Sequence, residues 1–224
     1  MSLRSLLPFA YSLGVLLLLP FAEHGLAELQ RFRAPRSIDC IGDVDARLRI
    51  VYLHGRDTYG PSWVELKNRD ALRALATSLD ARIALPRARG GWPLGNEAAL
   101  AKTQTIIGAA ARQCFHDPTS FGVIGFSDGA NVTNELFLQC RSTAALWFVS
   151  VGGDGAVRPD QLKGAAGCAR IAVVAGQHEP TYMGSKHFAR QLAKRGVDAR
   201  FFEHDGVHDL PFAPLYESVR SLSQ

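Results

Sequence analysis

The chain has 224 residues, of which 47% are hydrophobic and 21% are charged, and its formal net charge is +4. This composition supplies a sizeable core and excludes a chain that is disordered throughout. The basic residues are scattered and lack interleaved aromatic side chains that could stack on bases, so the positive charge does not indicate a nucleic-acid-binding protein. The length is typical of one large domain.

Residues 1–27 have the layout of a secretory signal peptide. Arg4 precedes an apolar run over residues 6–22, and the small residues Gly25 and Ala27 fit the −3 and −1 positions of a cleavage site. An uncleaved membrane anchor is the alternative, because the apolar run approaches the length that spans a bilayer. The small residues favour cleavage, so we expect a secreted or periplasmic protein with no stable membrane insertion after cleavage.

Four cysteines follow this segment, and they are Cys40, Cys114, Cys140 and Cys168. An even number of cysteines behind an export signal indicates two disulfides, although the spacing alone leaves all three pairings open. None of the spacings is CxxC, so the sequence does not indicate a zinc site. Four buried thiols are the alternative to two bridges.

From residue 47 onwards, short apolar runs alternate with stretches of helical periodicity, whereas residues 28–46 are polar and irregular. We expect an extended N-terminal segment over 28–46 and one domain over 47–224. Continuous apolar strands that alternate with helices indicate a parallel sheet covered on both faces. The predicted fold class is α/β, a three-layer sandwich whose mostly parallel central sheet has about six strands. The expected strands are 47–55, 81–88, 120–127, 144–153, 169–176 and 198–206, and the expected helices are 72–79, 96–115, 130–137, 184–195 and 212–222.

Ser127 lies between an expected strand and an expected helix, within the pentapeptide GFSDG. In this context the G-x-S-x-G pattern predicts a nucleophile on a tight, strained turn at the carboxyl end of a strand, where such sheets bind ligands. Gly125 and Gly129 occupy positions where a side chain would collide with the neighbouring strand or helix. A surface turn is the alternative, but it does not explain why the hydrophobic period changes at the serine.

A serine hydroxyl becomes an effective nucleophile when a base removes its proton and a carboxylate orients that base. His208 lies in the loop after the last expected strand and is the favoured base, whereas its rival His204 falls within the strand run itself. Glu179 lies three residues after the strand that ends at Gly176, and it is the favoured acid. The order Ser127, Glu179, His208 agrees with the order nucleophile, acid, base.

With this order of residues, 47–224 resembles the α/β-hydrolase superfamily. The stretch YLHGRD is similar to the family's oxyanion loop through the pair His54 and Gly55. The resemblance implies that the backbone amides of Arg56 and Asp128 form an oxyanion hole. It also implies that His54 holds the loop and does not transfer protons.

The same resemblance bears on the pocket and on the acid. Trp92 lies in a loop that usually walls the pocket in this family, with ordinary core packing as the alternative. Glu179 stands where the family often has an aspartate, and its alternative role is a charge at the start of a helix. Asp205 and Asp209 are the other candidate acids, but they lie too near His208 in sequence for the family's usual geometry.

The family's sheet order implies a pairing of the cysteines. Cys40 leads into the strand over 47–55, and Cys114 ends the helix before the strand over 120–127, which is its neighbour in the family's sheet. Cys140 ends the helix after the nucleophile, and Cys168 introduces the strand over 169–176. The implied bridges are Cys40–Cys114 and Cys140–Cys168.

The closest resemblance within the superfamily is to small lidless serine esterases of the carboxylesterase, dienelactone-hydrolase and secreted-depolymerase kind. The family's first two strands are absent or reduced here, and residues 152–169 are too few for a large lid. The resemblance implies an open site for small or polymeric esters, with no metal and no organic cofactor. A peptidase or thioesterase with the same residues, or a catalytically silent binding protein of this fold, is the alternative.

Overall fold

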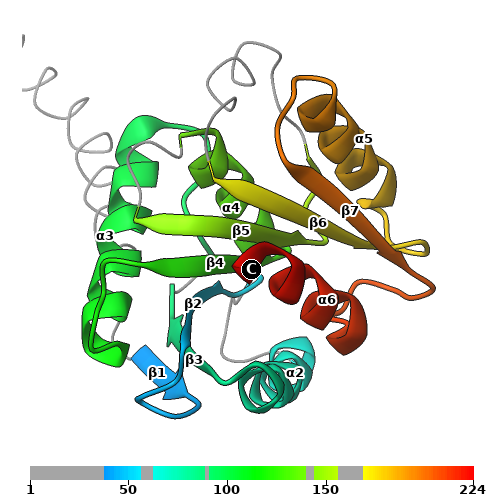
Figure 1. Ribbon diagram of the computed structural model, residues 1–224. Coiled ribbons are helices and arrows are strands. Elements are labelled where there is room, and N and C mark those ends of the chain that lie inside the picture. The colour runs from blue at the N-terminus through cyan, green and yellow to red at the C-terminus, as the bar shows by residue number, and fades with distance from the viewer. Residues whose placement is uncertain (1–37, 57–62, 89–90, 140–143, 156–168) are drawn as a thin grey trace, which may run out of the picture. The chain divides into compact units, whose positions relative to one another are not determined.

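A central sheet of seven strands organises the computed structural model, which describes residues 38–56, 63–88, 91–139, 144–155 and 169–224. The order across the sheet is β1-β3-β2-β4-β5-β6-β7, and β1 is antiparallel to β3 while the other neighbours are parallel (Figure 1). All of them lie in one compact unit within Pro35–Gln224, and residues 1–34 lie outside the described ranges. The strands are β1 (Ile38–Ile41), β2 (Leu48–Leu53), β3 (Ala81–Pro86), β4 (Phe121–Phe126), β5 (Ala145–Val151), β6 (Arg170–Gly176) and β7 (Ala199–His204).

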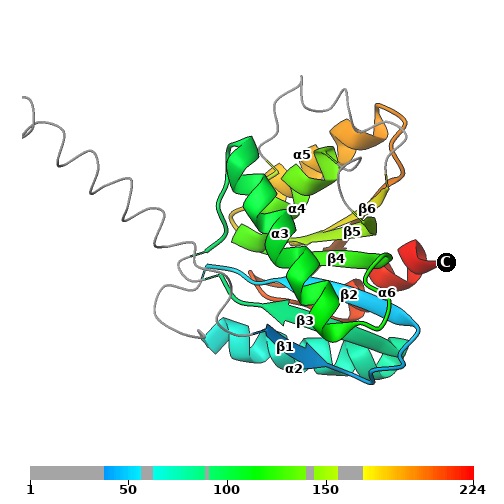
Figure 2. The same cartoon turned by 90° about the vertical axis from the view of Figure 1, so that its left-hand side faces the viewer.

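Helices cover both faces of the sheet, which confirms the predicted three-layer α/β architecture. Figure 2 shows α2 on one side of the sheet and α4 and α5 on the other. Consecutive residues of a buried strand point to opposite faces, so each strand contributes to two apolar clusters. In β4, Val123 packs in the cluster under α3, α4 and α5, and Ile124 packs in the cluster under α2 and α6. The helices are α2 (Trp63–Leu79), α3 (Glu97–Cys114), α4 (Asp128–Leu138), α5 (Tyr182–Ala193) and α6 (Phe212–Ser223).

Local sequence signals explain where two of these helices begin or end. Asn96 caps α3, because its side-chain oxygen accepts the Ala99 N–H at 2.8 Å. After α5, Gly196 adopts a positive φ of 74°, and its N–H donates to the Ala193 carbonyl at 3.0 Å. A glycine tolerates this left-handed backbone without steric cost, which stops the helix. No helix within the described ranges is long and apolar enough to cross a membrane.

Strand β1 is the element that the sequence did not predict. Residues 38–41 lie inside the segment over 28–46 that was expected to be extended and irregular, and they form a strand that pairs antiparallel with β3, with Cys40 opposite Ala84. The strand has only four residues, each of them partly exposed, so its sequence carries no clear period. The sheet therefore has seven strands where about six were expected, and residues 28–37 lie outside the described ranges.

The order of the strands reverses between β2 and β4. From β2 the chain moves outward to β3, and it then returns to the other side of β2 to form β4. The connecting helices α2 and α3 consequently lie on opposite faces of the sheet. The segments after β2 and β4 diverge at such a switch point, and ligands of parallel α/β sheets bind there, beyond the carboxyl ends of the strands.

A disulfide joins the edge strand to a helix on one face. Cys40 of β1 is bonded to Cys114, the last residue of α3, with a Cα–Cα distance of 5.7 Å. Beside it, the Gln113 side-chain amide donates to the Ile38 carbonyl at 3.1 Å. This bridge confirms the Cys40–Cys114 pairing, whereas the predicted Cys140–Cys168 pair lies outside the described residues.

Removal of this bridge is expected to destabilise the domain. We expect the double variant Cys40→Ser/Cys114→Ser to lose about 2–4 kcal/mol of unfolding free energy. The reason is that the bridge joins residues 74 positions apart and so restricts the unfolded chain. Urea denaturation monitored by circular dichroism measures the loss, with the single variants as controls for a free thiol. An unfolding free energy equal to that of the wild type contradicts the prediction.

Candidate active site

Ser127 occupies a strained turn between β4 and α4. Its backbone angles are φ 56° and ψ −117°, and Asp80 is the other non-glycine residue with positive φ among those that the structure describes. Such a conformation costs roughly 1–3 kcal/mol and persists only where the surroundings hold it. Here the Ser127 N–H donates to the Val151 carbonyl at 2.9 Å, and the Ser127 carbonyl accepts the Ala130 N–H at 2.9 Å. The turn is therefore fixed from both sides.

The two glycines of the pentapeptide allow close backbone contacts. A Cβ on Gly125 would lie 2.2 Å from the Gly129 carbonyl oxygen, and a Cβ on Gly129 would lie 2.1 Å from the Leu53 carbonyl oxygen. Both distances are far inside van der Waals contact, so neither position accepts a side chain without movement of the backbone. The first turn of α4 thus packs directly on the carboxyl end of β2.

The loop after β2 lies beside the serine. A Cβ on Gly55 would be 3.2 Å from the Ser127 Cβ. Across this gap, Arg56 Nε donates to Asp128 Oδ2 at 2.8 Å, and the hydrogen bond and charge of Asp128 raise the pKa of the Arg56 guanidinium. The backbone N–H of Asp128 is in the first turn of α4, where amides have no acceptor within the helix and the helix dipole favours negative charge. The side chains of Arg56 and Asp128 thus tie together the residues of the predicted oxyanion hole.

His54 is a buried structural residue in this loop. Its Nε2 accepts the Ala88 N–H at 2.9 Å, and its Nδ1 lies 2.5 Å from the Gly55 carbonyl oxygen. Since an amide N–H can only donate and a carbonyl can only accept, the ring carries its hydrogen on Nδ1 and is neutral. Trp92 is also buried, and its indole N–H donates to the His54 carbonyl at 2.9 Å. Trp92 therefore packs in the core and anchors the loop at the same time.

His208 and Glu179 form a hydrogen-bonded pair at the neighbouring strand ends. His208 Nδ1 lies 2.6 Å from Glu179 Oε2, and the other Glu179 oxygen accepts the Gly176 N–H at 2.9 Å. The Glu179 side chain is 2% exposed and that of His208 is 35% exposed, so the carboxylate is shielded while the imidazole reaches solvent. The His208 ring packs on Phe126, the residue before Ser127, with ring centroids 4.8 Å apart. With Nδ1 held by the carboxylate, Nε2 is the imidazole nitrogen that remains to accept a proton.

The rival residues are engaged elsewhere. Asp205 lies 2.8 Å from His178 Nε2 in an exposed pair, and Asp209 accepts Lys67 Nζ at 2.7 Å. His204 ends β7, and its ring lies over Gly206, where a Cβ would be 2.5 Å from the His204 Nδ1.

Gly152 belongs to the site, although sequence reasoning did not identify it. It follows β5 with a positive φ of 66°, and a Cβ there would lie 2.8 Å from His208 Nδ1 and 2.9 Å from Glu179 Oε2. The absence of a side chain leaves the space that the pair occupies. The sequence placed Gly152 in the expected strand over 144–153, and the side chains that need this space come from loops far along the sequence.

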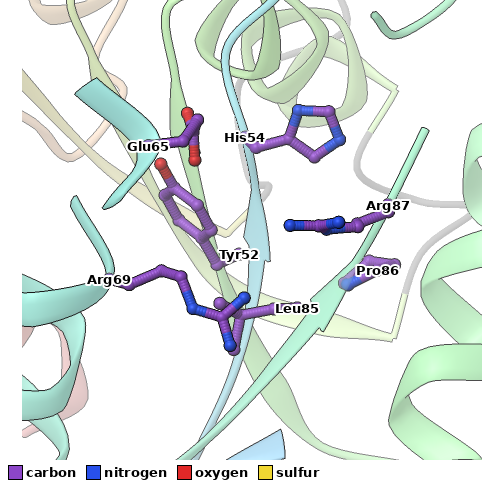
Figure 3. Close-up of a pocket in the computed structure, with 7 residues that line it drawn as sticks. All are labelled: Tyr52, His54, Glu65, Arg69, Leu85, Pro86 and Arg87. Carbon is purple, nitrogen blue, oxygen red and sulfur yellow. The ribbon is translucent and has the colours of Figure 1, made fainter. Parts of the chain in front are cut away.

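Glu65 is a second residue that the sequence did not single out. It lies on α2 with 8% exposure, and its Oε1 accepts the Gly55 N–H at 3.0 Å. A small pocket with a volume of about 30 Å³ adjoins it behind the loop, and Figure 3 shows the Tyr52 hydroxyl directed toward the Glu65 carboxylate in this pocket. The helix expected from the sequence covers 72–79 only, whereas α2 begins at Trp63, so Glu65 lay outside every expected element. The pocket is lined by Tyr52, His54, Glu65, Arg69, Leu85, Pro86 and Arg87.

Comparisons with known proteins agree with this architecture. No family model and no curated protein sequence matches the chain. Among solved structures, the chain is similar to the esterase PE8, with 18% identity, a TM-score of 0.63, and coverage of 83% of this chain and 98% of that one. It is also similar to carboxyl esterase 2 of the fungus Tuber melanosporum, with 18% identity, a TM-score of 0.60, and coverage of 83% and 82%.

A third similar structure covers more of the chain. The esterase of Pyrobaculum calidifontis has 16% identity and a TM-score of 0.55, and the match covers 92% of this chain and 88% of that one. Identities this low establish the architecture and leave the activity to be argued from the site. The seven-stranded sheet, its strand order and these similar structures together show that the chain has the α/β-hydrolase fold.

Proposed function

We propose that the protein is an exported serine hydrolase that cleaves carboxylic esters. The observation that carries the proposal is the buried Glu179 carboxylate on Nδ1 of His208, with the His208 ring stacked beside the turn of Ser127. This arrangement supports a nucleophile, base and acid with the roles of a serine hydrolase triad. The strained backbone of Ser127 adds support, because strain of this kind is retained at sites where it serves a function.

In the proposed mechanism, His208 Nε2 removes the Ser127 proton as the serine oxygen attacks the ester carbonyl carbon. The carbonyl oxygen becomes negatively charged, and it accepts hydrogen bonds from the backbone amides of Arg56 and Asp128. The C–O bond to the alcohol then breaks, and the imidazolium returns its proton to the leaving oxygen. Water attacks the acyl-enzyme by the same steps and releases the acid. Glu179 accepts the hydrogen on His208 Nδ1 and stabilises the imidazolium.

Esters are the preferred substrate class for two reasons. The similar solved structures are named as esterases, and they span most of this chain. Esters also need less help for leaving-group departure than amides, which suits a site that the sequence indicates to be lidless and open. A peptidase or thioesterase is the second candidate, because acyl transfer uses the same groups. Parallel assays on a p-nitrophenyl ester, an anilide and a thioester of the same acyl group discriminate among these candidates.

The first prediction concerns the nucleophile and the base. We expect Ser127→Ala to lower kcat/KM for a p-nitrophenyl ester by roughly a thousandfold or more, because no other group attacks the carbonyl. His208→Ala is expected to be comparably damaging, and His204→Ala, as the matched control, is expected to retain activity. Near-wild-type turnover by Ser127→Ala would refute the mechanism and favour a binding protein of this fold.

The second prediction concerns the acid. Glu179→Gln preserves a side-chain acceptor for the Gly176 N–H but removes the charge beside His208, so we expect a loss of about a hundredfold to ten-thousandfold in kcat. Glu179→Asp is expected to be intermediate, because its shorter side chain reaches from the same backbone. Asp205→Asn and Asp209→Asn are the controls and should remain active. If either control is inactive while Glu179→Gln is fully active, the acid has been assigned to the wrong loop.

The third prediction concerns export. Residues 1–27 are proposed to be a signal peptide, so the mature protein should begin near Glu28. N-terminal sequencing of protein recovered from the periplasm or the medium measures this directly. Recovery of the chain in a membrane fraction with Met1 retained would instead support an uncleaved anchor.

A further inference from the structure

A buried carboxylate that the proposed mechanism does not use lies directly behind the oxyanion loop. Glu65 accepts the Gly55 N–H at 3.0 Å, and Gly55 immediately precedes Arg56, whose amide is one of the two proposed oxyanion donors. We propose that Glu65 is a positioning residue for catalysis: it holds the loop so that the Arg56 N–H faces the reacting carbonyl. The inference rests on the proposed function and deepens it.

The geometry of two successive peptide planes supports this role. In the trans peptide between Gly55 and Arg56, the Gly55 carbonyl and the Arg56 N–H point in opposite directions in one plane. The neutral His54 donates through Nδ1 to that carbonyl, which sets the axis of the Arg56 N–H. Glu65 holds the preceding plane through the Gly55 N–H. The Trp92 indole N–H also holds this preceding plane, through the His54 carbonyl at 2.9 Å. Without Glu65, the plane loses its acceptor on the Gly55 side and is held by Trp92 alone, so the Arg56 N–H can shift away from the oxyanion.

Glu65 is itself held by a buried chain of hydrogen bonds. The Tyr52 hydroxyl is hydrogen-bonded to Glu65, and Asn68 Nδ2 donates to the Tyr52 oxygen at 3.2 Å. Burial, and secondarily the charge of Glu65, raises the pKa of Tyr52 well above its ordinary value. The phenol therefore keeps its proton at physiological pH and remains a donor to the carboxylate. This chain anchors the loop to β2 and α2.

The charge of Glu65 is not what helps the reaction. A negative carboxylate behind the loop repels the negative oxygen that develops in the transition state, so any direct electrostatic effect opposes catalysis. The benefit must come from reach and geometry. The length of the side chain and its charge can be separated by substitution. Glutamine has the same length as glutamate and no charge, whereas aspartate has the charge but a shorter side chain.

The surroundings of Glu65 suit such substitutions. In Glu65→Gln, the new amide oxygen can accept the Gly55 N–H. If the Asn68 amide rotates, its Oδ1, which has no hydrogen-bond partner among the described residues, takes the place of Nδ2 and accepts from Tyr52. In Glu65→Ala, the adjoining pocket of about 30 Å³ gives water a route to the Gly55 N–H. The domain can then fold while the loop loses its fixed acceptor.

The experiment compares kcat and KM for a p-nitrophenyl ester among Glu65→Ala, Glu65→Asp and Glu65→Gln. We expect the Ala and Asp variants to lose about tenfold to a hundredfold in kcat, with KM within about twofold, since a displaced oxyanion donor costs transition-state stabilisation alone. Glu65→Gln is expected to stay within about threefold of the wild type. The matched control is Glu135→Ala, which also removes a carboxylate from a loop glycine, the Gly95 N–H at 3.3 Å, but away from the oxyanion loop.

A second readout separates positioning from a structural defect. A boronic acid inhibitor that mimics the tetrahedral intermediate should bind Glu65→Asp more weakly by the same factor as kcat falls, while the product carboxylate should bind unchanged. Equal activity in the Asp and Gln variants, or equal losses in Glu65→Asp and Glu135→Ala, overturns the inference. If Ser127→Ala is inactive and these variants behave alike, only the role of Glu65 fails. If Ser127→Ala is active, the proposed function itself fails.

Discussion

The candidate site depends on one backbone contact, in which Gly129 at the start of α4 meets the carboxyl end of β2. The gap is too small for a Cβ, which would approach the Leu53 carbonyl oxygen to 2.1 Å. This contact sets the spacing between the serine turn and the loop after β2. With that spacing, the Arg56 guanidinium reaches the Asp128 carboxylate at 2.8 Å. A larger residue at 129 would push α4 away from the carboxyl end of β2, because its Cβ would meet the Leu53 and His54 backbone.

The proposed base and acid also depend on a glycine that leaves room for their side chains. Gly152 leaves room for the contact between His208 and Glu179, and the His208 ring packs against the ring of Phe126. The structure also shows how the Glu179 side chain is held. The Glu179 side chain folds back on its own turn and accepts the Gly176 N–H, so its effective reach is shortened by the extra hydrogen bond.

Much of this arrangement could be predicted from the sequence, because it depends on local patterns. The continuous apolar runs predict the buried strands. The GFSDG turn and its order relative to Glu179 and His208 can also be identified along the chain. Strand β1 was missed because four partly exposed residues carry no period. Gly152 and Glu65 were missed for a different reason. The role of each depends on a side chain or amide brought close by the fold from another loop, and no neighbouring residue in sequence signals that contact.

The two buried glutamates, Glu65 and Glu179, each accept a glycine N–H, but their second partners differ. Glu65 and Glu179 each direct one oxygen to the N–H of a glycine after a strand, Gly55 after β2 and Gly176 at the end of β6. A buried carboxylate is costly unless donors compensate it, and the glycine amide supplies part of that compensation in both cases. What differs is the second partner. An imidazole can take up a proton and become a cation, so Glu179 beside His208 can stabilise a charge that appears during the reaction. The Tyr52 phenol keeps its proton, because burial raises its pKa, so Glu65 can exchange no charge and can only hold the loop in place.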